Sequence, residues 1–146
     1  MKLKIYQIDA FAENVFEGNP AAVIPLASWL TDECLQKIAE ENNLSETVFF
    51  VPLDNDFHIR WFTPNNEVAL CGHATLAAAY VLFNCLNYQR PTIKFDSLSG
   101  WLSVSRQQSL LTMDFPVAEY CACDTPIELI SGLGKVPIAC YEGEDY

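Results

Sequence analysis

The chain has 146 residues, which is enough for one ordinary domain with a sizeable apolar core. Its hydrophobic fraction of 51% and charged fraction of 18% are typical of a globular protein and exclude an intrinsically disordered chain. The formal net charge of −11 argues against a nucleic-acid partner, because phosphates need clustered Lys and Arg.

The six cysteines allow three interpretations: disulfides, a metal site or free thiols. Asp9 interrupts the apolar residues at the start of the chain, so that stretch does not form the apolar region of a signal peptide. Without secretion, reduced thiols are the default, and the sequence therefore predicts a cytoplasmic protein. Cys121 and Cys123 form a C-x-C pair rather than C-x-x-C, and Cys140 lies far from them, so no metal site is predicted.

The first part of the chain predicts two strands followed by a helix. Residues 3–11 alternate between apolar and polar side chains, and residues 21–26 form a second short strand. The turn at residues 16–20 separates them, because it contains glycine, asparagine and proline. A helix is predicted to start at Thr31, because a threonine that can cap the helix is followed by two acids in the first turn. The two asparagines at residues 42–43 end this helix.

More strands follow this helix. Residues 46–51 and 57–62 are rich in β-branched and aromatic side chains and predict a hairpin. Three more alternating segments predict strands at residues 92–96, 100–104 and 110–115.

The segment at residues 70–83 is the centre of the predicted domain. No charged residue occurs from Gly72 to Leu86, and a helix that is apolar all round belongs inside a core. A membrane span is not predicted, because it needs roughly 20 apolar residues and Asn84 interrupts the run first. The sequence therefore predicts an α+β domain, in which a mostly antiparallel sheet curls around a central helix buried on all sides.

The tail of the chain differs from this pattern. Thr125 as cap and Pro126 at the first position predict a short helix at residues 125–130, and a strand follows at residues 137–141. We therefore predict a first domain at residues 1–116 and the beginning of an incomplete second domain at residues 117–146.

Glu46 is the first candidate for chemistry. It lies at the mouth of an apolar strand, where desolvation would favour the protonated carboxyl group. A carboxyl group in that position suits proton abstraction and return. The alternative is a solvated acid at the end of a strand.

The start of the central helix carries the other candidates. Free N–H groups and the positive end of the helix dipole at Gly72, His73, Ala74 and Thr75 predict an anion site. His73 is either a neutral hydrogen-bond donor or proton relay, or a packed histidine bonded to a carbonyl group. Cys71 is either a thiolate favoured by the helix start or an inert core thiol.

Asn19 is a weaker candidate for binding. Its amide group can contact a ligand from the turn between Gly18 and Pro20. An asparagine in that position is equally an ordinary turn residue.

Several short strings of residues carry more information together than each does alone. In chain order they are Asp9-Ala10-Phe11, Gly18-Asn19-Pro20-Ala21-Ala22-Val23, Asn43-Leu44-Ser45-Glu46-Thr47, Arg60-Trp61-Phe62-Thr63-Pro64, Glu67-Val68 and Cys71-Gly72-His73-Ala74-Thr75. This ordered set resembles the PhzF-like family, the phenazine-biosynthesis-type isomerases related in fold to diaminopimelate epimerase. The resemblance runs from the start of the chain to Phe115.

The resemblance implies half of a two-domain isomerase with its active site in the cleft between the domains. It implies that Glu46 moves a proton between carbon atoms of a small carboxylate without any cofactor, and that His73 positions the substrate or relays a proton. Backbone N–H groups at residues 72–74 would hold the substrate carboxylate. Cys71 corresponds to a catalytic cysteine of the related epimerases and ranks below Glu46.

Family members are markedly longer than this chain, so three hypotheses stay open. The first is an isomerase or epimerase half, for which a homodimer would supply the second wall of the cleft. The second is a catalytically inactive fragment, or a domain that binds a small ligand or a protein. The third is a thiol-based racemase that uses Cys71.

Overall fold

The computed structural model describes residues 2–115 and 119–143. The chain divides into two compact units, Met1–Phe115 and Pro116–Tyr146. Among the described residues, no helix has the length and apolar character needed to cross a membrane.

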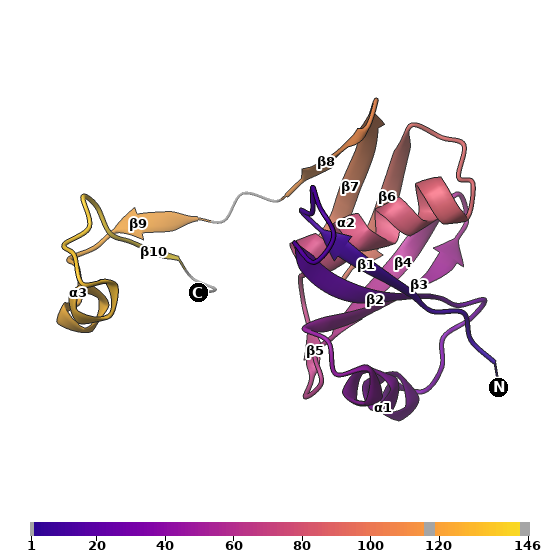
Figure 1. Cartoon of the computed structure of the whole chain (residues 1–146), viewed down its shortest axis with the longest axis horizontal. Coiled ribbons are helices and arrows are strands. Elements are labelled where there is room, and N and C mark those ends of the chain that lie inside the picture. The colour runs from indigo at the N-terminus through magenta and orange to yellow at the C-terminus, as the bar shows by residue number, and fades with distance from the viewer. Residues whose placement is uncertain (1, 116–118, 144–146) are drawn as a thin grey trace. The chain divides into compact units, whose positions relative to one another are not determined.

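The first unit contains one curled, mixed sheet in the order β1-β2-β3-β4-β6-β7-β8, with β5 paired to β4 (Figure 1). Its strands are β1 (Tyr6–Ala10), β2 (Asn19–Pro25), β3 (Glu46–Leu53), β4 (Asp56–Phe62), β5 (Glu67–Val68), β6 (Thr92–Ser97), β7 (Gly100–Gln107) and β8 (Leu110–Asp114). The predicted α+β class is confirmed, but the sheet includes the parallel pairs β2–β3 and β4–β6. In both pairs a helix lies between the strands in the sequence, because parallel neighbours need a long crossover connection.

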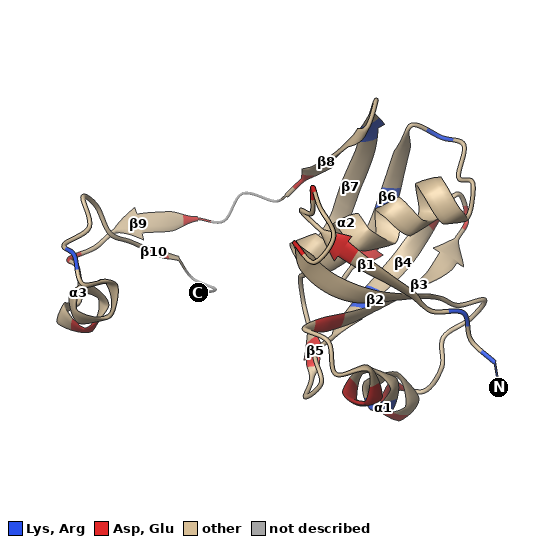
Figure 2. Ribbon diagram, in the orientation of Figure 1, with Lys and Arg blue, Asp and Glu red and all other residues tan. Residues whose placement is uncertain are grey.

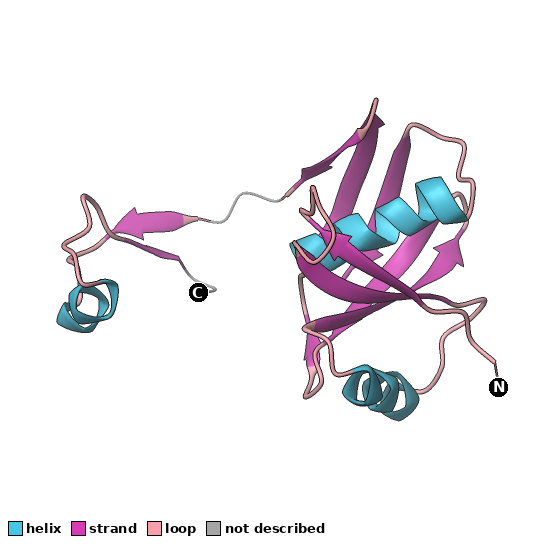
Figure 3. Cartoon of the chain, viewed as in Figure 1, coloured by secondary structure: helices cyan, strands magenta, loops and turns pink. Residues whose placement is uncertain are grey.

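The two crossover helices pack against opposite faces of the sheet (Figure 3). Successive residues of a strand point to opposite faces, so Val48 belongs to the cluster that contains α2, Gly72–Tyr80. Phe49 belongs to the cluster that contains α1, Asp32–Asn42. Val23 and Ile24 of β2 divide between the two clusters in the same way, so both strands carry buried apolar side chains on both faces.

Helix α2 packs closely on the sheet because its buried positions are small: Ala74, Thr75, Ala77, Ala78 and Ala79. It carries no charged side chain (Figure 2) and continues as a π-helical turn, η1, at Val81–Cys85. The expectation that this helix is enclosed on all sides is wrong, since Tyr80 at its end is 45% exposed.

The turn before β2 is shorter than predicted. Asn19 is the first residue of β2 and pairs with Ala10, so the turn ends at Gly18. Gly18 has a φ of 90°, and a Cβ atom there would lie 2.4 Å from the Ala10 carbonyl oxygen. Only glycine fits this combination of left-handed backbone and close approach.

The second unit contains β9 (Tyr120–Ala122), α3 (Ile127–Leu133) and β10 (Tyr141–Gly143), with β9 and β10 antiparallel. The predicted cap is wrong, because Pro126 rather than Thr125 is the N-cap of α3. The strand predicted at residues 137–141 begins only at Tyr141. Between residues 119 and 143 no residue is buried.

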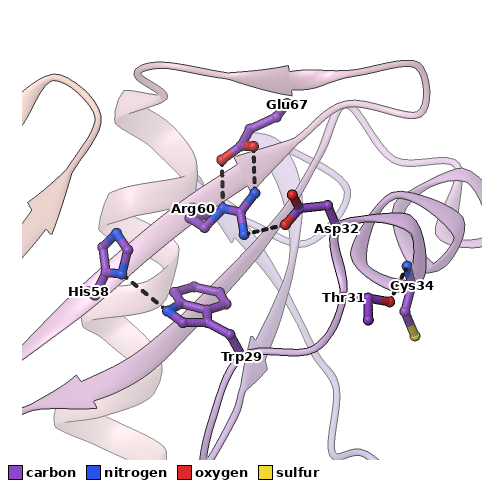
Figure 4. Close-up of polar contacts among 7 residues, drawn as sticks. All are labelled: Trp29, Thr31, Asp32, Cys34, His58, Arg60 and Glu67. Carbon is purple, nitrogen blue, oxygen red and sulfur yellow. Dashed lines mark hydrogen bonds and ion pairs between the residues drawn. The ribbon is translucent and has the colours of Figure 1, made fainter.

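A charged network ties α1 and β5 to β4 (Figure 4). The guanidinium of Arg60 donates to both carboxylate oxygens of Glu67 at 2.7 and 2.6 Å and to Asp32 at 2.8 Å. These hydrogen bonds raise the pKa of Arg60 above its ordinary value, and the bond to Glu67 has the larger effect. Beside them, the indole N–H of Trp29 donates to Nδ1 of His58 at 3.1 Å.

Replacing Arg60 with Met is expected to lower the free energy of unfolding by about 1.5–3 kcal/mol, because partly buried Glu67 loses its charged donors. Urea denaturation followed by circular dichroism measures this loss. Lys37→Met is the matched control, since Lys37 and its partner Glu33 are 69% and 78% exposed. It should cost no more than about 0.5 kcal/mol, and equal losses would contradict the prediction.

Candidate active site at the start of helix α2

The site forms where the first residue of β3 meets the first turn of α2. Glu46 begins β3, and its backbone pairs with Ala21 of β2. Cys71 is the N-cap of α2, and His73 is the second residue of that helix. Residues separated in the sequence by the β3–β4 hairpin and β5 thus meet at one end of α2.

The imidazole of His73 lies between the other two side chains. Its Nε2 atom is 3.0 Å from Oε2 of Glu46, and its Nδ1 atom is 3.4 Å from the sulfur of Cys71. The side chains of His73 and Glu46 are only 11% and 19% exposed. The thiol, imidazole and carboxylate groups therefore lie within reach of one another, which proton transfer between them requires.

The contact between Glu46 and His73 has the distance of an ion pair but not the alignment of a hydrogen bond. Both Glu46 Oε2 and His73 Nε2 are buried, and neither has a hydrogen-bond partner among the residues that the structure describes. Buried polar atoms normally have a hydrogen-bond partner. Since Glu46 Oε2 and His73 Nε2 lack one within the described part of the chain, both atoms are available to bond to a ligand.

Burial raises the pKa of the Cys71 thiol to about 11, and the nearby Glu46 carboxylate acts in the same direction. The backbone N–H groups of Ala74 and His73 oppose this shift but do not cancel it. Cys71 is therefore a thiol near neutral pH. A thiol can donate to Nδ1 of His73, which leaves the proton of the neutral imidazole on Nε2.

Alkylation of Cys71 by iodoacetamide is expected to be slow near pH 8 and to accelerate until about pH 11, because only the thiolate reacts. Peptide mapping by mass spectrometry at a series of pH values measures this rate. Exposed Cys85 is the internal control and should be modified first at pH 8. Cys71 reacting as fast as Cys85 at that pH would contradict the prediction.

Not every side chain predicted to bind a ligand at the first turn of α2 is available to do so. The Thr75 hydroxyl donates to the Cys71 carbonyl at 2.6 Å, and Thr75 is wholly buried, so this side chain serves the helix rather than a ligand. At Gly72 a Cβ atom would lie 2.8 Å from the ring of Phe115. Glycine therefore lets Phe115 cover the start of the helix.

Ser45, which was not among the predicted site residues, joins Asn19 to the segment that carries Glu46. The Ser45 hydroxyl lies 3.1 Å from Oδ1 of Asn19 and 3.0 Å from the carbonyl oxygen of Pro20. Ser45 directly precedes Glu46, and that adjacency was the available signal. Phe115 was also missed, because its contact with Gly72 spans much of the chain.

The same three side chains form a possible metal site. One ligating atom each from Glu46, Cys71 and His73 lie within 4.8 Å of one another. The sequence predicted no metal site, on the spacing of Cys121, Cys123 and Cys140.

Comparison with known proteins identifies close relatives. The family described as phenazine biosynthesis-like protein matches residues 8–136. An uncharacterized isomerase of Pseudomonas aeruginosa is 53% identical over 146 residues, which is 100% of this chain and 56% of that protein. The human phenazine biosynthesis-like domain-containing protein is 47% identical over 125 residues, or 80% of this chain and 43% of that protein. The chain spans about half the length of these curated relatives.

Solved structures show the same fold. A PhzF-family phenazine biosynthesis protein from Enterococcus faecalis has a TM-score of 0.91 and 45% identity, covering 99% of this chain and 56% of that chain. A hydroxyproline epimerase from Agrobacterium vitis has a TM-score of 0.53 at 9% identity, covering 84% of this chain and 45% of that chain. The second likeness is one of fold alone.

Proposed function

Because the chain belongs to the phenazine biosynthesis-like family, we propose that it is the N-terminal half of a cofactor-independent isomerase or epimerase. The observation that carries the proposal is the 3.0 Å approach of Glu46 Oε2 to His73 Nε2 in a largely buried site. The reaction is the transfer of a proton from one carbon position of a small carboxylate to another position, or to the opposite face.

In this mechanism the Glu46 carboxylate accepts the proton from carbon and later returns it. The N–H on Nε2 of His73 stabilises the negative charge that develops on the substrate while Glu46 holds the proton, and it can relay the proton. Backbone N–H groups at Gly72, His73 and Ala74 bind the substrate carboxylate at the positive end of α2. The side-chain amide of Asn19, at the start of β2, also binds the substrate.

The proposal requires a second wall for the site. Residues 117–146 are proposed as the start of a second domain, and a homodimer is the alternative source of that wall. Light scattering on the purified protein distinguishes a monomer near 16.4 kDa from a dimer. A cytoplasmic location stays a prediction from the sequence.

The activity is tested by solvent proton exchange. The purified chain is incubated in D₂O with a panel of small aromatic and amino-acid carboxylates, and NMR follows the loss of each carbon-bound proton. Catalysed exchange in at least one compound, above a no-protein control, is expected. No exchange with any of them, in a dimer or a monomer, would contradict the proposal for this chain.

A catalytically inactive domain that binds a small ligand is the second candidate, and the buried Glu46 Oε2 and His73 Nε2 atoms, which lack hydrogen-bond partners among the described residues, favour it. NMR titration with the same carboxylates distinguishes the two. Shifts of the amide signals of residues 72–75 without proton exchange would support the binding domain.

A further inference from the structure

The cluster of Glu46, Cys71 and His73 has the donor set of a zinc site. One carboxylate oxygen, one sulfur and one imidazole nitrogen lie within 4.8 Å of one another. Zn²⁺ takes N, S and O ligands in tetrahedral geometry, and three protein ligands leave a fourth position open. Ca²⁺ and Mg²⁺ prefer oxygen ligands alone, so the sulfur of Cys71 selects a softer ion.

Charge and hydrogen bonding favour the same ion. Glu46 Oε2 and His73 Nε2 are buried and lack partners among the described residues, and a cation would satisfy both. A Cys71 thiolate and a Glu46 carboxylate would together balance the two positive charges of Zn²⁺. The buried site would then hold no net charge, which removes most of the cost of burying an ion.

We propose that Glu46, Cys71 and His73 bind Zn²⁺, with water or a small anion in the fourth position, and that zinc thereby inhibits the proton transfer. The inhibition rests on the proposed function, but the binding does not. Binding exchanges the proton of the Cys71 thiol for zinc, so each zinc ion bound releases one proton to solvent.

The C-terminal unit contains a second pair of thiols that the experiment has to separate. The sulfurs of Cys123 and Cys140 lie 3.5 Å apart, and the pair has no third ligand of the required geometry among the described residues. Cys123→Ser is therefore the matched control for Cys71→Ser, because both variants remove one thiol from a close contact.

Isothermal titration of the reduced full-length chain with ZnCl₂ tests the binding. Buffers with different ionisation enthalpies report the protons released per zinc ion. Loss of a residue that only hydrogen-bonds to a metal ligand weakens metal binding by about 10- to 100-fold. A larger loss of zinc affinity is expected for each of the ligand variants Cys71→Ser, His73→Gln and Glu46→Gln. Cys123→Ser should retain the affinity and the proton release of the wild type.

Co²⁺ provides a spectroscopic check at the same site. A sulfur-to-cobalt charge-transfer band should appear in wild type and in Cys123→Ser and be absent from Cys71→Ser. Wild-type affinity for zinc in Cys71→Ser, or loss of binding in Cys123→Ser, would overturn the proposal, as would no measurable binding to the wild type. Catalysed proton exchange without zinc binding would overturn only this inference. Zinc binding without exchange would support the zinc site, and would contradict the proposed function and with it the inhibition.

Discussion

Replacing Glu46 with Gln should reduce the rate of catalysed solvent proton exchange by about 10²- to 10⁴-fold. The amide has nearly the shape of the carboxylate but cannot accept the proton from carbon. The measurement is the NMR exchange assay in D₂O, on whichever carboxylate the wild-type chain exchanges fastest.

Glu40→Gln is the matched control, because Glu40 is an exposed acid on α1 and changes the net charge equally. It should exchange protons at the wild-type rate. Circular dichroism must show both variants folded. An exchange rate of Glu46→Gln equal to that of Glu40→Gln would exclude Glu46 as the base.

The largest expected effect on stability comes from Trp61 in β4. Trp61 is 1% exposed and packs in the same cluster as the buried alanines of α2. Trp61→Ala should therefore lower the free energy of unfolding by about 3–5 kcal/mol, through lost contacts and the cavity left behind. Since domains are stable by only about 5–15 kcal/mol, this loss would bring the chain close to unfolding.

Trp101→Ala makes the same chemical change at a position that is 56% exposed and should cost much less. Trp61→Phe should cost less than Trp61→Ala, because the ring still fills most of the space and the indole N–H has no partner among the described residues. Urea denaturation followed by circular dichroism ranks the three. A loss at Trp101 as large as that at Trp61 would contradict this account of the core.

The parts of the fold that local patterns specify were predicted well. The hairpin of β3 and β4 follows from two β-rich segments joined by a short turn, and it forms as expected. The helix α1 is capped by Thr31, whose hydroxyl accepts from the N–H of Cys34 as predicted. Both features depend on residues close in sequence.

Long-range pairing could not be predicted in the same way. The parallel pairs β2–β3 and β4–β6 depend on which strand edges the crossover helices leave free, and no local pattern encodes that choice. The contact of Phe115 with Gly72 also joins distant segments. The Arg60 network likewise joins three elements. In the sequence, Asp32 indicated only a helix start and Glu67 belonged only to a motif string, so neither predicted a contact with Arg60.

The candidate site was predictable to the extent that its residues lie in ordered strings. Glu46, Cys71 and His73 were singled out, and the structure brings them together. The orientation of Thr75 was not predictable, because a threonine in a helix start can face a ligand or bond to the preceding turn. Whether Cys71 is ionised also depended on burial that the sequence does not show.

Strands that are apolar on both faces have a further consequence. In a strand with one polar face, a register shift by one residue would bury polar side chains and expose apolar ones. Val48 and Phe49 are both apolar and buried, so exchanging these two residues would move no polar group. The amino-acid composition and mean hydropathy would stay identical. At these two positions side-chain volume distinguishes the faces, because each helix is held at a distance set by the residues beneath it. Steric fit, rather than polarity, therefore decides which face of the strand each of the two residues occupies.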